Sequence, residues 1–389
     1  MNGISELAMA LLDRDGQPQP LPEPLPLDAL PTPALVLDRA VLQSNINKMA
    51  DHLAGHNKGF RPHAKTHKCP QISRLQLEAG AVGVCVAKLG EAAALMGGGV
   101  EEILVTSPVA SPAKAQVVAA LAGRNQSLRI VVDSELGLDV LAAALPPDTQ
   151  LGVLVDLDVE MGRTGVRDQE LVYRLLDRIA GDERLRFDGV QHYAGHLMHV
   201  ADFAERRTRS LASWDAIAER VSDLSERGFT PGIVTGCGTG TYDIDIEAEL
   251  VTDLQVGSYI FMDEEYRQVL DGGGQRFEYF DVSLTVACTG ISQPTSRTMT
   301  VDGGYKAFAS DSVMPVTDDF ADVSFRFAGD EHGVLILPKG QQALQLGQVV
   351  RFVTPHCDPT VNLHDYYWVL EEDGLVHNRW PITARGCSW

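Results

Sequence analysis

The chain has 389 residues, of which 44% are hydrophobic and 22% charged, a composition typical of globular domains. Its net charge of −21 argues against nucleic acid and anionic membranes as partners, so we expect a small-molecule ligand. The six cysteines contain no CxxC pair, and the sequence shows neither a secretory signal nor an apolar run of about 18 residues. These features predict a protein of the reducing cytoplasm.

The first 32 residues are expected to form an extension outside the main domains. Seven prolines lie in the stretch Asp15–Pro33. Proline fixes its own φ and removes a backbone donor, so this stretch is predicted to be an extended arm or linker rather than a helix. A helical pattern of apolar residues then begins after Asp38, whose side chain is a good N-cap.

Residues 33–272 alternate between short β-type runs and helical segments. This alternation predicts a parallel sheet with right-handed crossovers, and eight such units predict closure into a (β/α)8 barrel. A doubly wound open sheet is the alternative. The β-type runs lie near Gly59–Lys65, Gly83–Lys88, Glu102–Thr106, Leu128–Val132, Leu151–Leu157, Phe187–Tyr193, Gly232–Thr235 and Leu254–Ile260.

Residues 273–389 have a different pattern, in which short β-rich runs are separated by Gly and Asp turns and no long helix is indicated. We predict a separate antiparallel β domain here. Its runs are Val282–Cys288, Thr298–Val301, Val334–Leu337, Val349–Val353 and Tyr367–Leu370.

Basic residues cluster at the end of the first barrel strand. Arg61, His63 and Lys65 alternate and therefore share one face of a strand. An inward lysine is costly unless it is used, and burial beside other cations lowers the pKa of its amine and makes it nucleophilic. In so acidic a protein an amino-acid site needs local positive charge, for which Lys65 and Lys68 are candidates. A lysine that reaches solvent is the alternative.

Two further segments have the composition of binding sites. Residues Thr235–Thr241 are rich in glycine and hydroxyl groups and follow the seventh strand, where barrels commonly bind phosphate. The alternative is an ordinary flexible turn. On an extended backbone His356 and Asp358 point the same way and Cys357 points opposite, so the pair could form half of a divalent metal site. A purely structural His-x-Asp is the alternative.

These segments occur together in one known family. The run RPHAKTHK, residues 61–68, resembles the Schiff-base lysine motif of the D-threonine aldolase and D-serine dehydratase family. That family is similar in fold to alanine racemase, with a (β/α)8 barrel and a C-terminal β domain. Further ordered matches run from residues 32–38 to residues 380–386 and include Met161–Gly165, Gly257–Asp263 and Asp330–Gly333.

The resemblance implies a pyridoxal 5'-phosphate cofactor and a divalent metal, with Mn²⁺ expected first and Mg²⁺ or Zn²⁺ as alternatives. Lys65 is implied to form the Schiff base, and His356 and Asp358 to bind the metal. The remaining cofactor contacts are implied to be Arg163 near the phenolic oxygen, Tyr193 in the pocket, Gly238, Thr239 and Gly240 at the phosphate, and Tyr259 at the pyridine nitrogen.

Two positions distinguish branches of the family. The dehydratase branch resembles His-x-Cys, whereas this chain has His356-x-Asp358, as in the aldolase branch. Aldolase relatives usually carry Gln before the lysine at position 88, and Ala87 here removes any side-chain donor.

The resemblance implies retro-aldol cleavage of a D-3-hydroxy amino acid to glycine and an aldehyde. The base is left open between His63, His196 and a metal-bound hydroxide. Dehydration of D-serine or 3-hydroxyaspartate is the first rival, and a non-catalytic cofactor-binding protein is the second. A metal-dependent hydrolase that uses His63 and His67 as ligands is the third. A homodimer is expected, in which the β domain of one chain brings His332 or Asp302 near the barrel of the other.

Overall fold

The barrel is built from strands that are each followed by a helical segment. The structure, a computed structural model, describes residues 3–339 and 345–389. Within these residues eight parallel strands form one curled sheet in the order β3-β10-β9-β8-β7-β6-β5-β4. An isolated parallel bridge between His63 and Cys85 links the chain after β3 to β4 and closes the ring. The strands are β3 (Gly59–Phe60), β4 (Val84–Val86), β5 (Ile103–Val105), β6 (Arg129–Val132), β7 (Leu151–Leu157), β8 (Leu185–His192), β9 (Ile233–Gly236) and β10 (Asp253–Leu254).

This arrangement confirms the (β/α)8 barrel, and every predicted barrel strand is present. The first and last are shorter than predicted, because the chain leaves regular pairing at Phe60 and Leu254 and turns toward the mouth of the barrel. All of β7 is buried, and its Leu154 packs with Cys85, Leu104 and Val131 from β4, β5 and β6, so this part of the barrel interior is a packed core.

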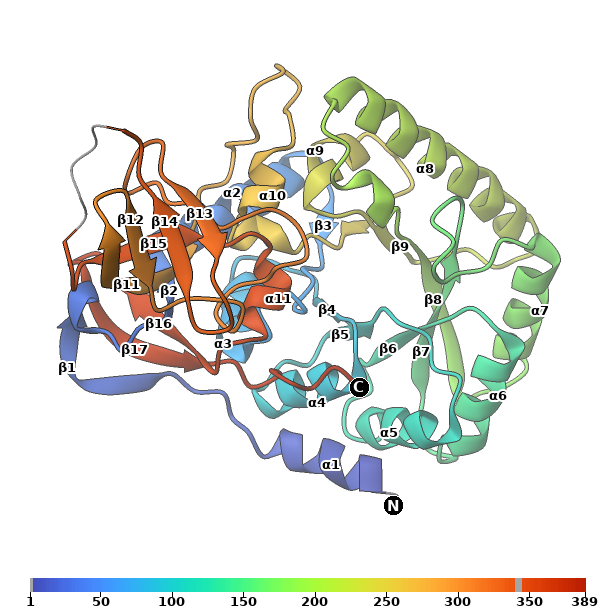
Figure 1. The fold of residues 1–389 in the computed structure, drawn as a ribbon. Helices are drawn as coiled ribbons and strands as arrows, with labels where there is room; N and C mark the ends of the chain where they lie inside the picture. The colour runs from blue at the N-terminus through green and yellow to red at the C-terminus, as the bar shows by residue number, and fades with distance from the viewer. Residues whose placement is uncertain (1–2, 340–344) are drawn as a thin grey trace.

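Helices surround the barrel on its outer side (Figure 1). Capping side chains fix where several of them begin: Asp38 accepts from the backbone N–H of Val41, as predicted, and Asp202 accepts from that of Glu205. The helices are α2 (Arg39–Gly55), α3 (Pro70–Glu78), α4 (Leu89–Gly97), α5 (Pro112–Ala122), α6 (Glu135–Ala144), α7 (Gln169–Ala180), α8 (Phe203–Glu226), and the short α9 (Tyr242–Asp245) and α10 (Glu264–Arg267).

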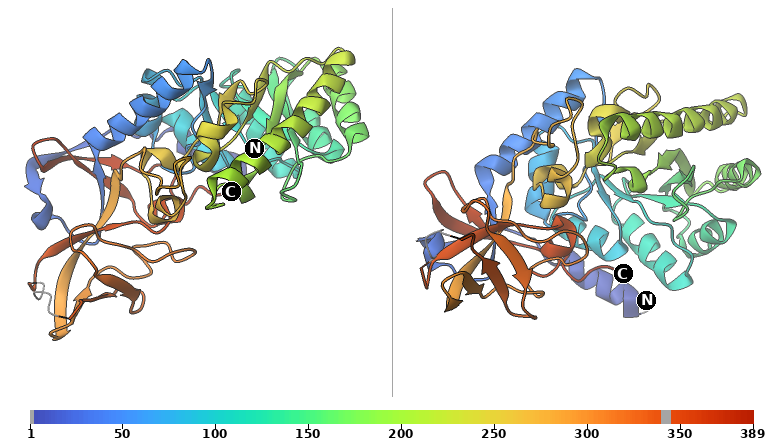
Figure 2. Two further views of the ribbon diagram at one scale, coloured as in Figure 1. Left: turned by 90° about the horizontal axis from the view of Figure 1, so that it is seen from above. Right: turned by 45° about the horizontal axis from the view of Figure 1, so that its top comes forward.

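A second sheet lies beside the barrel (Figures 1 and 2). Its strand order is β1-β17-β16-β2-β11-β12-β14-β13, with β15 paired to β11. Its pairs are antiparallel except β2 with β16, in agreement with the predicted β domain. The strands are β1 (Gln19–Pro26), β2 (Ala34–Asp38), β11 (Leu284–Thr295), β12 (Thr298–Val301), β13 (Ser324–Phe327), β14 (Gly333–Ile336), β15 (Val349–Val353), β16 (Tyr366–Leu370) and β17 (Leu375–Pro381).

The N-terminal segment contributes to both parts of the molecule. The proline-rich arm is extended, as predicted, and forms the edge strand β1, where proline is tolerated. Strand β2 also belongs to the second sheet, although residues 33–272 were expected to form the barrel domain. Before the arm, α1 (Gly3–Leu12) was not predicted; it packs on the barrel helices so closely that a Cβ on Gly97 would lie 2.7 Å from the carbonyl oxygen of Leu11. Among the described residues no helix has the length and apolar character needed to cross a membrane.

Candidate active site

The carboxyl ends of the barrel strands surround a cavity of about 230 Å³. Strand ends and the turns after them supply its wall, as expected for a barrel. Its lining residues are His63, Lys65, Thr66, Ala87, Thr106, Ser107, Arg163, Thr164, Gln191, Tyr193, Gly238, Thr239, Gln255, Gly257, Ser258 and Tyr266. The structure thus brings together six of the site residues proposed from the sequence: His63, Lys65, Arg163, Tyr193, Gly238 and Thr239.

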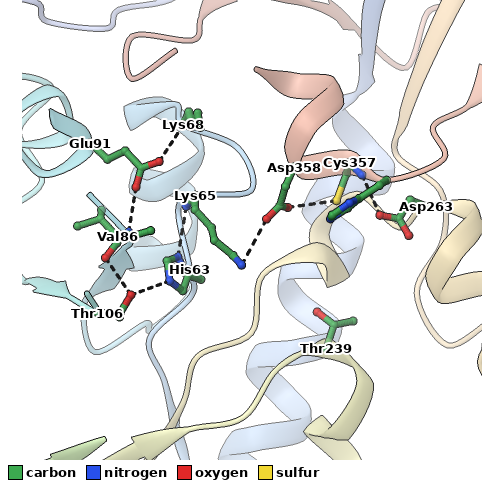
Figure 3. Close-up of polar contacts among 12 residues, drawn as sticks. His63, Lys65, Lys68, Val86, Glu91, Thr106, Thr239, Asp263, Cys357 and Asp358 are labelled. Carbon is green, nitrogen blue, oxygen red and sulfur yellow. Dashed lines mark hydrogen bonds and ion pairs between the residues drawn. The ribbon is translucent and has the colours of Figure 1, made fainter. Parts of the chain in front are cut away.

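Lys65 extends its amine toward the β domain, where it meets Asp358 (Figure 3). Its Nζ atom lies 3.6 Å from Oδ2 of Asp358. Burial acts to lower the pKa of Lys65, but the negative charge of Asp358 and the neighbouring Tyr193 outweigh it, and the net pKa is raised. The expectation of a lowered pKa is therefore wrong for the lysine as it stands here, because its nearest partner is an anion from the other domain.

His63 lies against the base of the same turn. Its Nδ1 faces the backbone N–H of Lys65 at 3.4 Å, and its Nε2 lies 3.1 Å from Oγ1 of Thr106. If Nδ1 accepts from that N–H, Nε2 carries the proton and donates to Thr106. Burial, and next the charge of Lys65, hold the pKa of His63 well below its usual value, so the ring is neutral at pH 7.

The other three basic residues of this motif, Arg61, His67 and Lys68, are absent from the cavity lining. Arg61 pairs with Asp253 at 3.3 Å, and both side chains are buried. Lys68 forms a buried pair with Glu91 instead of supplying charge to the cavity, which corrects the expectation from the sequence. Arg163 does line the cavity, with its guanidinium 5.1 Å from the ring centre of Tyr193.

The glycine-rich loop after β9 is closely packed from behind. A Cβ on Gly240 would lie 2.1 Å from the carbonyl oxygen of Met198, and one on Gly238 would lie 2.5 Å from its Sδ. Thr239 lines the cavity, and its Oγ1 accepts from the backbone N–H of Tyr259 at 3.0 Å. The loop therefore presents its backbone to the cavity because no side chains fit behind it.

Tyr259 lies elsewhere than its implied role requires. It is fully buried and absent from the cavity lining, and its hydroxyl accepts from Nε2 of Gln76 at 3.0 Å. Its neighbours Gly257 and Ser258 line the cavity in its place.

His356 and Asp358 lie at the start of α11 (Cys357–Val361): His356 has the predicted extended backbone, with φ of −141° and ψ of 123°, but the prediction is wrong for Asp358, which lies in the first turn of the helix. His356 is the N-cap, and Asp358 follows in the first turn, where an acidic residue favours a helix. Nδ1 of His356 is 2.9 Å from Oδ2 of Asp311 and 3.9 Å from Oε2 of Glu265. Neither His356 nor Asp358 is in the cavity lining, but Asp358 reaches the cavity edge through Lys65.

The charge on each member of the pair depends on its neighbours. Burial acts to lower the pKa of His356, but the charge of Asp358 and the hydrogen bond that the ring donates to Asp311 outweigh it, and the net pKa is raised. Burial acts to raise the pKa of Asp358, but Lys65 and then His356 hold it below the usual value. In residues 3–339 and 345–389 no three His, Cys, Asp or Glu side chains form a group that could hold a metal as they are arranged here.

His196, a candidate base, lies outside the cavity lining. It belongs to the short turn after β8, and its Nε2 is 3.6 Å from Oε2 of the exposed Glu160. Sequence reasoning missed several residues of the wall, including Thr106, Gln191 and Tyr266. The first two lie in or just after strands, and that position was an available signal; Tyr266 lies on the short helix α10, which Asp263 caps, and nothing in the local sequence marks it.

Comparison with known families and structures agrees with this geometry. The alanine racemase N-terminal domain matches residues 37–265, and a putative serine dehydratase domain matches residues 283–370. The chain is 36% identical to a 3-hydroxy-D-aspartate aldolase of Paracoccus denitrificans (strain Pd 1222), covering 91% of this chain and 92% of the relative. It is also 36% identical to a D-threonine aldolase of an Arthrobacter species, covering 93% and 95%.

Solved structures give the same picture. The crystal structure of D-threonine aldolase from Filomicrobium marinum is 34% identical and superposes with a TM-score of 0.91, over 95% of this chain and 100% of that one. The D-threo-3-hydroxyaspartate dehydratase of Delftia sp. HT23 is 24% identical with a TM-score of 0.81, over 92% and 98%, and supports the fold alone.

Proposed function

Since the chain belongs to the family of D-threonine and 3-hydroxy-D-aspartate aldolases with the alanine racemase fold, we propose that it is a pyridoxal-phosphate-dependent lyase. Its substrates are D-3-hydroxy amino acids, which it cleaves to glycine and an aldehyde. One observation carries the proposal: the cavity places the amine of Lys65 and the glycine-rich loop around one space, and Asp358 from the β domain reaches its edge.

The residues present fit the cofactor. Lys65 supplies the amine for a Schiff base, and Gly238, Thr239 and Gly240 offer backbone donors to a phosphate from a loop in which a Cβ on Gly240 would clash. Arg163 adds a positive charge to the same cavity. When bound, pyridoxal phosphate supplies an electron sink for the electron pair left by the broken Cα–Cβ bond.

A divalent metal also fits, at His356 and Asp358. The set is one imidazole nitrogen and carboxylate oxygen, which suits Mn²⁺ or Mg²⁺ as well as Zn²⁺. Asp358 pairs here with the ammonium of Lys65, and its carboxylate would be available to a metal cation if the cofactor held that amine. Mn²⁺ is the proposed metal, and its chemistry here is to bind the substrate β-hydroxyl and lower its pKa.

The chain's own groups orient the reactants. His63 holds the backbone N–H of Lys65 and faces Thr106, which fixes the turn that carries the amine. In this arrangement both ring nitrogens of His63 are engaged, so it acts as an orienting residue rather than as the base. Tyr266 closes one wall, and burial raises the pKa of its hydroxyl well above the usual value, so it keeps its proton and can donate a hydrogen bond.

Dehydration remains the rival reaction on the same fold. The experiment that separates the two is a product assay on purified protein with D-threonine and D-3-hydroxyaspartate, with and without added Mn²⁺. Glycine and an aldehyde support the proposal, and a 2-oxo acid with ammonia would replace it. L-threonine is the stereochemical control, and cleavage at the rate of D-threonine would contradict the preference for D substrates.

We also propose a homodimer in a reducing compartment such as the cytoplasm. The six cysteines are free and buried, as expected where thiols stay reduced. Of the two residues expected near a partner, Asp302 already accepts hydrogen bonds within its own chain from Thr32 Oγ1 at 2.6 Å and from Thr289 N at 2.8 Å. His332 is exposed and remains the candidate. Light scattering tests the state, and a fully active monomer would refute it.

A further inference from the structure

Lys68 lies three residues after Lys65 in the turn that follows β3, and its side chain points the other way (Figure 3). Its backbone has φ of +53°, a conformation that residues other than glycine rarely adopt. Its Nζ atom donates to Oε1 of Glu91 at 2.8 Å, and the two side chains are only 7% and 4% exposed. An ion pair with this little exposure must compensate the desolvation of two charges.

Glu91 joins this pair to a second turn of the cavity. Its Oε2 accepts from the backbone N–H groups of Ala87 and Lys88, at 2.9 and 3.1 Å, at the start of α4. Ala87 lines the cavity, as Lys65 does. One carboxylate therefore connects the turn that carries the reactive amine to the turn that forms the neighbouring wall.

The C-terminal tail covers the same pair. The carbonyl oxygen of Lys68 accepts from the N–H of Ala384 at 3.1 Å, and its Nζ also donates to Oγ of Ser388 at 3.3 Å. The tail lies so close to α4 that a Cβ on Gly90 would be 2.6 Å from the carbonyl oxygen of Cys387. The position of the turn is therefore determined from three directions: α4, the tail, and the strand before it.

We propose that Lys68 is a positioning residue for Lys65, acting through Glu91 and the C-terminal tail. A buried ion pair stabilises the fold little more than apolar side chains of similar size would. The Lys68–Glu91 pair does, however, fix the separation of two turns whose groups must contact one cofactor. The inference rests on the proposed role of Lys65 as the cofactor lysine. Lys68 itself touches neither the cavity nor Asp358.

The test compares Lys68→Met, Glu91→Gln, the double variant and Lys68→Arg with the wild-type protein. Two readouts do not depend on turnover: the affinity of the apoprotein for pyridoxal phosphate, and the fraction of Lys65 trapped by borohydride, read by peptide mass spectrometry. We expect Lys68→Met to weaken cofactor affinity and to lower kcat by about 10-fold or more, with KM little changed. Lys68→Arg should restore most of both.

Arg61→Met is the matched control, because Arg61 and Asp253 form a similarly buried pair, 5% exposed each, and neither residue lines the cavity. It should reduce stability and leave cofactor affinity and trapping unchanged. The double variant removes both charges of the Lys68–Glu91 pair and so keeps the test valid if Lys68→Met fails to fold.

The outcomes are distinct. Wild-type affinity and trapping in the double variant, with only a lower melting temperature, would make the pair merely structural and overturn the inference alone. So would an equal loss of cofactor affinity in Arg61→Met. Wild-type protein that is not labelled at Lys65 would overturn the proposed function and this inference together.

Discussion

Alanine at Gly240 or at Gly238 tests the loop behind the proposed phosphate site, because the two positions meet different parts of Met198. The Cβ of alanine 240 would lie 2.1 Å from a backbone carbonyl oxygen, whereas ordinary contact begins at 3.4 Å, so loop or backbone must move by about 1.3 Å. At position 238 the obstacle, at 2.5 Å, is the Sδ atom of a flexible side chain that can rotate away.

Overpacking of this kind costs about 1–3 kcal/mol. We expect Gly240→Ala to cost about 3 kcal/mol of free energy and Gly238→Ala about 1 kcal/mol or less. If this free energy is lost from the cofactor-binding conformation of the loop, the affinity for pyridoxal phosphate falls about 100-fold in Gly240→Ala and less than about 10-fold in Gly238→Ala.

Urea unfolding and cofactor titration of the apoprotein measure the two quantities. Gly232→Ala is the control, since its Cβ would meet Asp188 O at an ordinary 3.5 Å. A Gly240→Ala protein that binds cofactor like wild type would refute the reasoning, as would a Gly238→Ala protein that is the worse of the two.

Three other predictions concern single side chains. Borohydride should fix pyridoxal phosphate to Lys65 in wild-type protein, and Lys65→Met should abolish attachment; a label on any other lysine would contradict the assignment. A chelator should lower activity and Mn²⁺ should restore it, and Asp358→Ala should remove this metal response while cofactor absorbance persists; Cys357→Ala should leave it intact, because that thiol is fully buried. Burial raises the pKa of Asp245 to about 6, against 3.8 when unfolded, so its folded form binds a proton that the unfolded form has released between about pH 4 and 6. The contribution of Asp245 to the free energy of unfolding therefore falls as pH rises through that window. Asp245→Asn should show a smaller loss of stability from pH 4 to pH 6 in urea titrations, and an unchanged pH dependence would refute the assignment.

The barrel could be predicted from the sequence because its signal is local. Each strand is a short apolar run followed by a helical pattern, and period alone identifies both. The second sheet was predicted only in part, since β1 and β2 pair with strands more than 240 residues away, as between Leu37 and Leu284. No local pattern tells a strand which sheet it will join.

The site divides in the same way. Lys65 and the glycine-rich loop follow the ends of strands, and those ends can be located from the alternation of strands and helices along the sequence. The backbone at Asp358 was predicted wrongly because Pro359, which follows it, is compatible with the first turn of a helix as well as with an extended chain. The contact that decides between them is the hydrogen bond from the N–H of Cys357 to Asp263, a residue of the other domain.

Strand β2 also imposes an order on synthesis. It ends at Asp38, just before α2 begins, so β2, like β1, is made before any barrel strand. One of its two edges stays unpaired until β11 emerges, and the other until residues 366–370 do. A nascent chain therefore carries an open edge through most of its translation, an exposure that chaperones commonly cover. Asp358, which reaches Lys65, also lies in a segment made after every barrel strand, so the site is complete only once that segment has been made.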